Sequence, residues 1–333
     1  MFSSISSTVT ESRFFVMPHD SNAIGRLHGG VLMEWMVSAA ALCGVRFSKG
    51  EVVLAALDDL FFMNPVSVGD MVVVKAWVEY AGHSSMEVGV SAYAYPRIVG
   101  EPMLTTTSHM VFVAVDRTGS PRPLPTQIKP TKEEEQLYSL AEQRAEKRRK
   151  ILNDRKTMSL DTSEYGPDAR YRMKSSHLVA PSDATMGGIM SGGKLLHLLD
   201  EMAGAVAISY AKTVAVTGAV DSTSFHYPIR QGSIVDVELV LTGVGRSSAE
   251  VAAKVITENP SSGVRRHAAT TFFTMVAVDS AGKPVPMPPF EPSNEGEEKR
   301  LREMRARRAI RQRRLEEMQI FEPLHRMFAH GRG

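Results

Sequence analysis

The chain has 333 residues, 43% of them hydrophobic and 23% charged, and its formal net charge is +2. This composition is typical of a globular protein, its length predicts two domains, and its charge balance excludes a strongly basic chain. The single cysteine, Cys43, excludes an intramolecular disulfide framework, and we expect it to be a small buried residue.

The N-terminal stretch MFSSISSTVTESRFF is rich in hydroxyl groups and has one arginine and one glutamate. Organelle presequences are rich in arginine and poor in acidic residues, so this is a poor presequence, and the C-terminal AHGRG is not a peroxisomal signal. The sequence contains no run of about 18 apolar residues, so we predict no transmembrane helix. We therefore expect a cytoplasmic protein without integral membrane contact, with a mitochondrial location as the alternative.

An internal repeat runs through most of the chain at a constant offset. Pro18 matches Pro181, which lies 163 positions later, and the offset is still 163 at Pro123 and Pro286. The matched positions in between include Asp20 and Asp183, Gly29 and Gly192, Gly30 and Gly193, Asp58 and Asp221, Glu87 and Glu250, and Gly119 and Gly282. A register that keeps no gap over this span indicates two homologous units in tandem.

We place the first domain at residues 1–150 and the second at 170–315, each closed by a charged helix. The polar stretch 151–169 is the predicted linker, and 316–333 is a short C-terminal extension.

In each unit a long apolar segment follows the glycine pair, VLMEWMVSAAALCGV in the first and KLLHLLDEMAGAVAISY in the second. Both are too long for strands, so we predict one buried helix per unit. Strand-like runs follow: VVLAALDD, MVVVKAWVEY, MEVGVSAYAY and TTTSHMVFVAVD in unit one, then TVAVTGAVD, IVDVELVLT, AEVAAKVIT and AATTFFTMVAVD in unit two. Turn residues separate them.

The helix that closes unit one opens with a predicted capping box between Thr131 and Glu134. One helix has to cover a whole antiparallel sheet in each unit, which a sheet wrapped around that helix achieves. The predicted class is α+β, with the two units paired as a pseudo-dimer.

The two copies differ at two polar positions near the central helix. Asn22 is replaced by Thr185 in the second copy, and Asp200 occupies the position that Val37 has in the first. Each copy therefore keeps one member of a polar pair and has lost the other.

The order of the motifs in the two units resembles that of a known family. Asn-x6-Gly-Gly, an apolar helix, LDDLFFMNPVSVGD and GHSSMEV occur in this order, and VDSTSFHYPIRQGS and GRSSAEV repeat it. This order resembles the tandem hotdog-fold acyl-CoA thioesterases, over about residues 14–313. The resemblance implies two hotdog domains, hydrolysis of fatty acyl-CoA, and a trimer of double hotdogs.

The resemblance also implies sites that combine residues of both units. One site would use Asn22 to orient water or substrate, the Gly29 backbone N–H as oxyanion donor, and Asp200 as general base or nucleophile. The second would combine Thr185 and Gly192 with Val37, which has no carboxylate, so we expect one working site per chain.

Each of these residues also has a less specific interpretation. Asn22 could be a turn residue, and Glu201 could be the acid if the register slipped by one. His28 could bind a metal or act as a base, but a single histidine at a helix start is more often a cap, and we place it with Gly30 at the substrate. Its counterpart Ser191 departs from the histidine usual in the family.

Further substrate contacts are expected in the Gly-x-Ser-Ser turns, where the family often contacts CoA. These are Ser84, Ser85, Ser247 and Ser248. The runs RAEKRRK and RARRAIRQRR could bind the CoA phosphates, or could be solvated helices, laced with salt bridges, that cover the sheet.

Two other functions fit the sequence less well. A hydratase or dehydratase of the same fold uses an Asp with a His five positions later, or a lone catalytic His with a distant acid, whereas Asp20 and His28 are eight apart. A non-catalytic acyl-CoA sensor would not need a carboxylate near the thioester. No metal or organic cofactor is implied, since CoA is part of the substrate, and no nucleic-acid motif accompanies the arginines.

Overall fold

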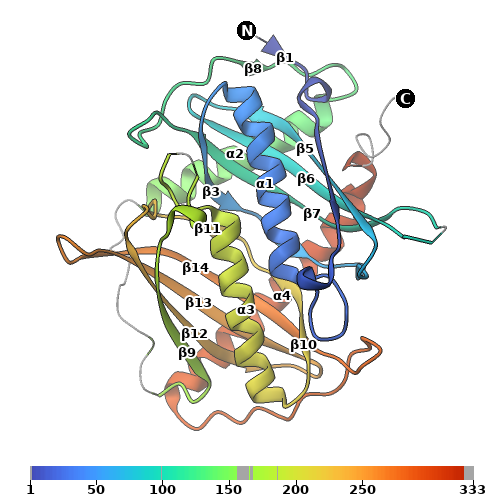
Figure 1. The fold of residues 1–333 in the computed structure, drawn as a ribbon, viewed down its shortest axis with the longest axis vertical. Coiled ribbons are helices and arrows are strands. Elements are labelled where there is room, and N and C mark those ends of the chain that lie inside the picture. Colours follow the sequence, from blue (N-terminus) through green and yellow to red (C-terminus); the bar gives the residue numbers. More distant parts are fainter. Residues whose placement is uncertain (1, 99, 156–164, 166–167, 186, 326–333) are drawn as a thin grey trace.

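The computed structural model describes residues 2–98, 100–155, 165, 168–185 and 187–325. Two long helices, α1 (Gly29–Ser48) and α3 (Gly192–Ala211), lie in front of two antiparallel sheets, with α2 (Glu135–Arg155) and α4 (Glu295–His325) behind them (Figure 1). The bounds of α1 and α3 differ by 163 at both ends, so the repeat in the sequence is a repeat in structure.

The strands repeat with the same offset. Those of unit one are β1 (Phe2–Ser3), β2 (Thr10–Phe15), β3 (Val52–Leu57), β4 (Leu60–Phe61), β5 (Met71–Ala81), β6 (Ser85–Tyr95), β7 (Met103–Ala114) and β8 (Gln127–Ile128). Those of unit two are β9 (Arg172–Leu178), β10 (Ala215–Val220), β11 (Thr223–Ser224), β12 (Ile234–Val244), β13 (Ser248–Asn259) and β14 (Val264–Ala277). The predicted helices and the eight predicted strands are confirmed to within a few residues.

The two sheets exchange a short strand. One has the order β11-β3-β7-β6-β5-β2 and the other β4-β10-β14-β13-β12-β9. Thr223 of β11 pairs with Leu57 of β3, and Leu60 of β4 pairs with Val220 of β10. Each sheet therefore takes its terminal strand from the other unit, which locks the units together at the centre of the molecule.

The central helices run in opposite directions and pack through their N-terminal thirds (Figure 1). A Cβ added to Gly30 would lie 2.7 Å from a ring carbon of His197, and one added to Gly193 would lie 3.0 Å from the Glu34 backbone. The two glycines therefore permit a helix crossing closer than any side chain would allow. This crossing brings the start of each helix to the middle of the other.

Helix α1 contains an 18-residue window that, by length and composition alone, is apolar enough to cross a membrane. Helix α1 therefore passes a test of length and composition that we expected no segment of the chain to pass. Within the fold, 61% of that window is buried, and α1 packs on β3, β5, β6 and β7. These contacts are those of the core helix of a wrapped sheet.

The structure also bears on the expectations for Cys43, the capping box and the domain boundaries. Cys43 is 1% exposed, as predicted, and burial raises the pKa of its thiol to about 12. Glu134 accepts the Thr131 N–H at 2.9 Å, which is one half of the predicted capping box. Helices α2 and α4 extend past residues 150 and 315, and the rest of the linker and C-terminal extension lies largely outside the described residues, so the domain boundaries stay predictions.

Candidate active site

Asp200 is the centre of the candidate site. It lies in the third turn of α3, is 1% exposed, and belongs to unit two, whereas the helix start that it faces belongs to unit one. Its neighbour Glu201 has a side chain that is 61% exposed. The buried carboxylate is therefore Asp200, whereas Glu201 is exposed to solvent.

The two carboxylate oxygens of Asp200 have different surroundings. Oδ1 accepts a 2.7 Å hydrogen bond from the Thr217 hydroxyl on β10. Oδ2 is buried and makes no hydrogen bond to the described residues, and it lies 3.5 Å from His28 Nδ1. A buried polar atom without a partner is costly, so such atoms are retained mainly where a water, a ligand or a reaction uses them.

Burial raises the pKa of Asp200 above its usual value. His28, the Thr217 hydroxyl, the nearby Gly30 N–H, whose hydrogen bond goes to His28 Nδ1, and His197 oppose this shift without cancelling it. A carboxylate held in this way is a stronger base than an exposed aspartate, because the protein stabilises its charged form less well than water does.

The N-terminus of α1 lies next to the Asp200 carboxylate. A Cβ on Gly29 would lie 2.7 Å from Thr217 Oγ1 and 3.2 Å from Asp200 Oδ2. Glycine at this position thus allows the start of α1 to approach Thr217 and Asp200 this closely. The first N–H groups of a helix have no partner within it and carry the positive end of the helix dipole, which suits a developing negative charge.

His28 is the N-cap of α1, and its Nδ1 accepts the Gly30 N–H at 3.1 Å. The capping role considered from the sequence is therefore present. The His28 ring also lies 5.7 Å from that of His197, whose Nδ1 is 2.9 Å from Glu34 Oε2. Glu34 and His197 are equivalent positions of the repeat, and their pair joins the two helices beside the site.

Asn22 has a turn role in the structure. Its Oδ1 accepts the N–H groups of Ile24 and Arg26, both at 3.1 Å, and no contact with Asp200 is among the interactions of the described residues. The Asn22 N–H also donates to the Arg26 carbonyl at 2.7 Å, and the equivalent loop of unit two forms the corresponding bond, from the Thr185 N–H to the Ile189 carbonyl at 2.8 Å, without an asparagine. The turn itself therefore does not require Asn22.

The second half-site, where the start of α3 faces unit one, is apolar. A Cβ on Gly192 would meet Leu54, which is the repeat counterpart of Thr217, at 2.6 Å, and one on Gly193 would meet Val37, the counterpart of Asp200. Thr217 was missed from the sequence, although the repeat contains the signal: a hydroxyl in one copy faces a leucine in the other at the same strand position. The acid and its hydrogen-bond donor are absent together from this half-site.

The serine turns lie elsewhere. Ser84 and Ser85 close the β5–β6 hairpin, where their carbonyls accept the N–H groups of Ala114 and Gly82. Ser247 and Ser248 close the equivalent β12–β13 hairpin and line a cavity of about 380 Å³ beneath α4. Helices α3 and α4 lie on opposite faces of this sheet (Figure 1). Since residues of α4 line the cavity, it is on the face away from α3 and Asp200. Contact of these serines with CoA stays a prediction.

The arginine-rich helices bind the sheets through buried carboxylates. On α2, Arg144 pairs with Glu79 and Glu87, and Arg148 pairs with Glu87 and, at 2.6 Å, with Asp58. A buried carboxylate requires such a partner to offset the loss of hydration. The four contacts fix α2 on the outer face of its sheet.

Helix α4 repeats this arrangement. Arg307 is 2.7 Å from Glu250, and Arg311 is 2.5 Å from Asp221 and 2.7 Å from Glu250. These residues are the repeat counterparts of the unit-one set, 163 positions later. The guanidinium groups of these four arginines are paired with the sheet, as the salt-bridge interpretation predicts, and binding of CoA phosphates by the two runs stays a prediction.

Comparisons with known proteins agree with this architecture. A model of the thioesterase superfamily matches residues 24–100 and 187–264, once in each unit. The cytosolic acyl coenzyme A thioester hydrolase of Mus musculus is 30% identical over 313 residues, covering 87% of this chain and 80% of the relative. The chain belongs to the acyl-CoA thioester hydrolases. The predicted family and tandem hotdog fold are thereby confirmed.

Solved structures of acyl-CoA thioester hydrolases and their relatives match as well. A Staphylococcus aureus acyl-CoA hydrolase, in complex with butyryl coenzyme A, coenzyme A and coenzyme A disulfide, is 31% identical, covering 47% of this chain and 95% of that chain with a TM-score of 0.43. An acyl-ACP thioesterase from Bacteroides thetaiotaomicron is 13% identical and covers 82% of this chain and 100% of that chain with a TM-score of 0.51, which shows a shared fold.

Proposed function

We propose that this chain hydrolyses fatty acyl-CoA to a free fatty acid and CoA at one site between its two units. The observation that carries the proposal is the Asp200 carboxylate, buried between a helix N-terminus and a hydrogen-bonding threonine, with one oxygen unpaired. The family membership of the chain supports thioester hydrolysis as the reaction.

In this proposal the thioester carbonyl lies against the start of α1, where the Gly29 N–H stabilises the oxyanion. Asp200 Oδ2, the oxygen without a hydrogen bond, either removes a proton from water or attacks the carbonyl to form a mixed anhydride. Thr217 holds the other oxygen and so fixes the direction of the carboxylate. The CoA thiolate is a good leaving group, so the reaction needs no metal or organic cofactor.

We assign the amide nitrogen of Asn22 to orienting the water or the substrate, since its oxygen is already used by the turn. Asn22→Asp keeps that oxygen acceptor and removes the amide donor, whereas Asn22→Ala removes both. If the amide nitrogen acts, both variants lose kcat. If Asn22 only forms the turn, Asn22→Asp retains activity, and the orienting role is wrong.

The experiment that tests the function measures free CoA released from acyl-CoAs of short to long chain length, for the wild type, Asp200→Asn and Glu201→Gln. Hydrolysis that is lost only in Asp200→Asn supports the proposal, since the two variants change adjacent carboxylates of opposite exposure. A folded wild type that binds acyl-CoA without releasing CoA would show a binding protein instead. The roles of base and nucleophile are separated by single turnovers in ¹⁸O-labelled water, because only the anhydride route can leave product unlabelled.

We further propose a trimer of double hotdogs in the cytoplasm. The edge strands β2 and β9 end in exposed apolar residues at equivalent positions, Phe15 at 67% and Leu178 at 63% exposure, which supports association at both edges. The location is supported by the name of the mouse relative. Light scattering after gel filtration tests the trimer, and cell fractionation distinguishes the cytoplasm from the mitochondrial alternative.

A further inference from the structure

A second hollow lies in unit two, away from Asp200. It has a volume of about 240 Å³ and is built from the loop before β12, the end of β13 and the start of β14. Its lining residues are Tyr227, Pro228, Arg230, Ser233, Thr257, Asn259, Ser262, Val264 and Arg266. Two of these nine are arginines and none is acidic, so the lining carries a net positive charge.

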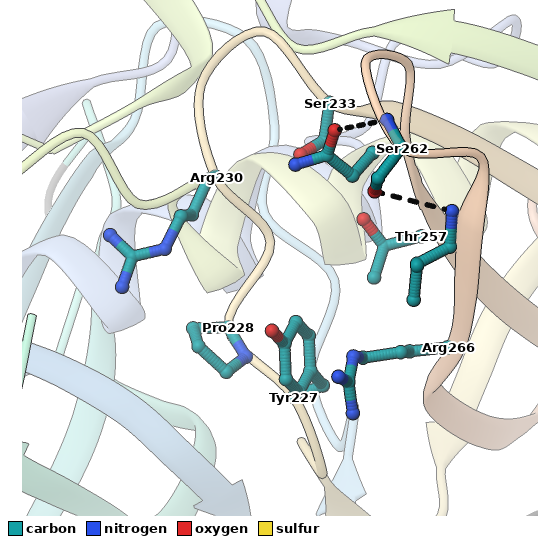
Figure 2. Close-up of a pocket in the computed structure, with 9 residues that line it drawn as sticks. Tyr227, Pro228, Arg230, Ser233, Thr257, Ser262 and Arg266 are labelled. Atoms are coloured by element: carbon teal, nitrogen blue, oxygen red, sulfur yellow. Dashed lines mark hydrogen bonds between the residues drawn. The ribbon is translucent and has the colours of Figure 1, made fainter.

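The two arginines are held by other groups that leave their charge uncompensated. Figure 2 shows Arg230 and Arg266 on either side of Pro228 and Tyr227. The Arg266 guanidinium lies 4.6 Å from the centre of the Tyr227 ring, and Arg230 donates to the Thr118 carbonyl of unit one at 3.1 Å. A ring and a carbonyl orient a guanidinium without neutralising it, so both can still bind an anion.

The remaining polar groups add hydrogen-bond donors. Asn259 Oδ1 accepts the Ser261 and Ser262 N–H groups, and Ser262 Oγ accepts the Val264 N–H at 3.4 Å (Figure 2). These bonds use acceptor atoms, which leaves the Asn259 amide and the Ser262 hydroxyl as donors. Phosphate oxygens are acceptors only, and guanidinium groups bind them with charge-assisted bonds.

The repeat shows that this pocket is not a general feature of the fold. At the equivalent positions of unit one, Ser67 replaces Arg230, Met103 replaces Arg266 and Asn64 replaces Tyr227. The pocket is also attached to the loop of the half-site that lacks an acid, through the Gln231 N–H donated to the Gly188 carbonyl at 2.8 Å. The pocket therefore adjoins the half-site that lacks an acid, although it lies in the unit that supplies Asp200.

We infer that this pocket, which we call the Arg230–Arg266 pocket, binds a phosphorylated organic anion at a position separate from the Asp200 site. Two sources share this chemistry: the phosphoadenosine part of a CoA molecule, and a phosphorylated metabolite unrelated to CoA. The inference concerns binding alone and does not depend on hydrolysis.

The test is isothermal titration at low ionic strength, with adenosine 3′,5′-bisphosphate and inorganic pyrophosphate as probes. The matched variants introduce the residues of unit one itself, Arg266→Met and Arg230→Ser. Arg265→Met is the control, because Arg265 is not among the lining residues and pairs with Asp236 at 2.9 Å. Thermal unfolding of each variant confirms that it is folded.

Binding to the wild type that weakens about tenfold or more in Arg266→Met and Arg230→Ser, and not in Arg265→Met, supports the pocket. Binding of the bisphosphate alone assigns it to a CoA molecule, and binding of both probes assigns it to phosphate groups in general. Absence of binding at about 1 mM, or binding that Arg266→Met leaves unchanged, overturns the inference.

Discussion

The Thr217 hydroxyl donates a 2.7 Å hydrogen bond to Asp200 Oδ1, and this bond ties strand β10 to helix α3 directly beneath the start of α1. It determines which carboxylate oxygen is free. The equivalent strand position in unit one is Leu54 and the equivalent helix position is Val37, so the bond exists in one half of the molecule only.

Asp200→Asn should lower kcat by about 10²- to 10⁴-fold, the usual contribution of a general base. The variant keeps the size of the side chain and removes a charge that burial disfavours, so its thermal stability should equal or exceed that of the wild type. Steady-state CoA release and thermal unfolding, measured together, check both expectations. Retained activity in this variant would remove Asp200 from the mechanism.

Thr217→Val should lower kcat about tenfold or more, because it deletes a hydrogen bond to a charged group without changing the shape of the side chain. The bond stabilises the ionised carboxylate, so its loss should raise the pKa of Asp200 further. Since the ionised form is the active one, activity rises with pH through this pKa. The acidic limb of the kcat/KM profile should therefore move to higher pH in Thr217→Val, and an unmoved limb would contradict the assignment.

Gly29→Ala should abolish most activity, because its Cβ would lie 2.7 Å from Thr217 Oγ1 and would fill the space beside Asp200. Gly192→Ala is the matched control: its Cβ would clash with Leu54 at 2.6 Å, at the half-site without an acid. We expect comparable losses of thermal stability in the two variants. Only Gly29→Ala should lose kcat out of proportion to stability.

Arg311→Met should cost about 1.5 to 3 kcal/mol of unfolding free energy, since it removes the arginine that pairs with half-buried Asp221 and one of the two that pair with buried Glu250, which keeps Arg307. Arg302→Met on the same helix is the control. Arg302 is 68% exposed and pairs with Glu298 at 3.8 Å, so its loss should cost less than about 0.5 kcal/mol. Equal losses in urea denaturation would argue against a structural role for Arg311.

Glu297 should make stability sensitive to acid. Burial raises its pKa, but hydrogen bonds from Arg170 and Ser293 outweigh this and lower the pKa to about 2. The stabilisation is complete above the usual value of 4.5 and is lost as the pH falls from there towards about 2. Glu297→Gln should cost about 1 to 2 kcal/mol at pH 7, a value reduced because Arg170 is partly exposed, and should flatten the decline below pH 4.5.

The apolar and β-rich patterns predicted the central helices and eight strands, the constant offset of 163 predicted that the two units fold alike, and the family resemblance implied the crossed arrangement of Asp200 and Gly29. The patterns did not predict β2 and β9, whose sequences TESRFF and RMKSSHL carry too many charged and polar residues to show a strand pattern. The offset and the family position favoured Asp200 over Glu201, and the packed helix adds the difference in burial between these adjacent residues. The roles of individual arginines depended on carboxylates far away in the sequence.

The exchange of β4 and β11 between the sheets determines how the two units unfold. Because each sheet is completed by two residues that the other unit supplies, a unit expressed alone would lack a strand and would expose the edge of β3 or β10 to unrelated chains. The halves should then unfold together in one transition, even after cleavage of the segment that connects them. The working site, which needs a helix start from one half and an acid from the other, persists only as long as this mutual edge pairing does.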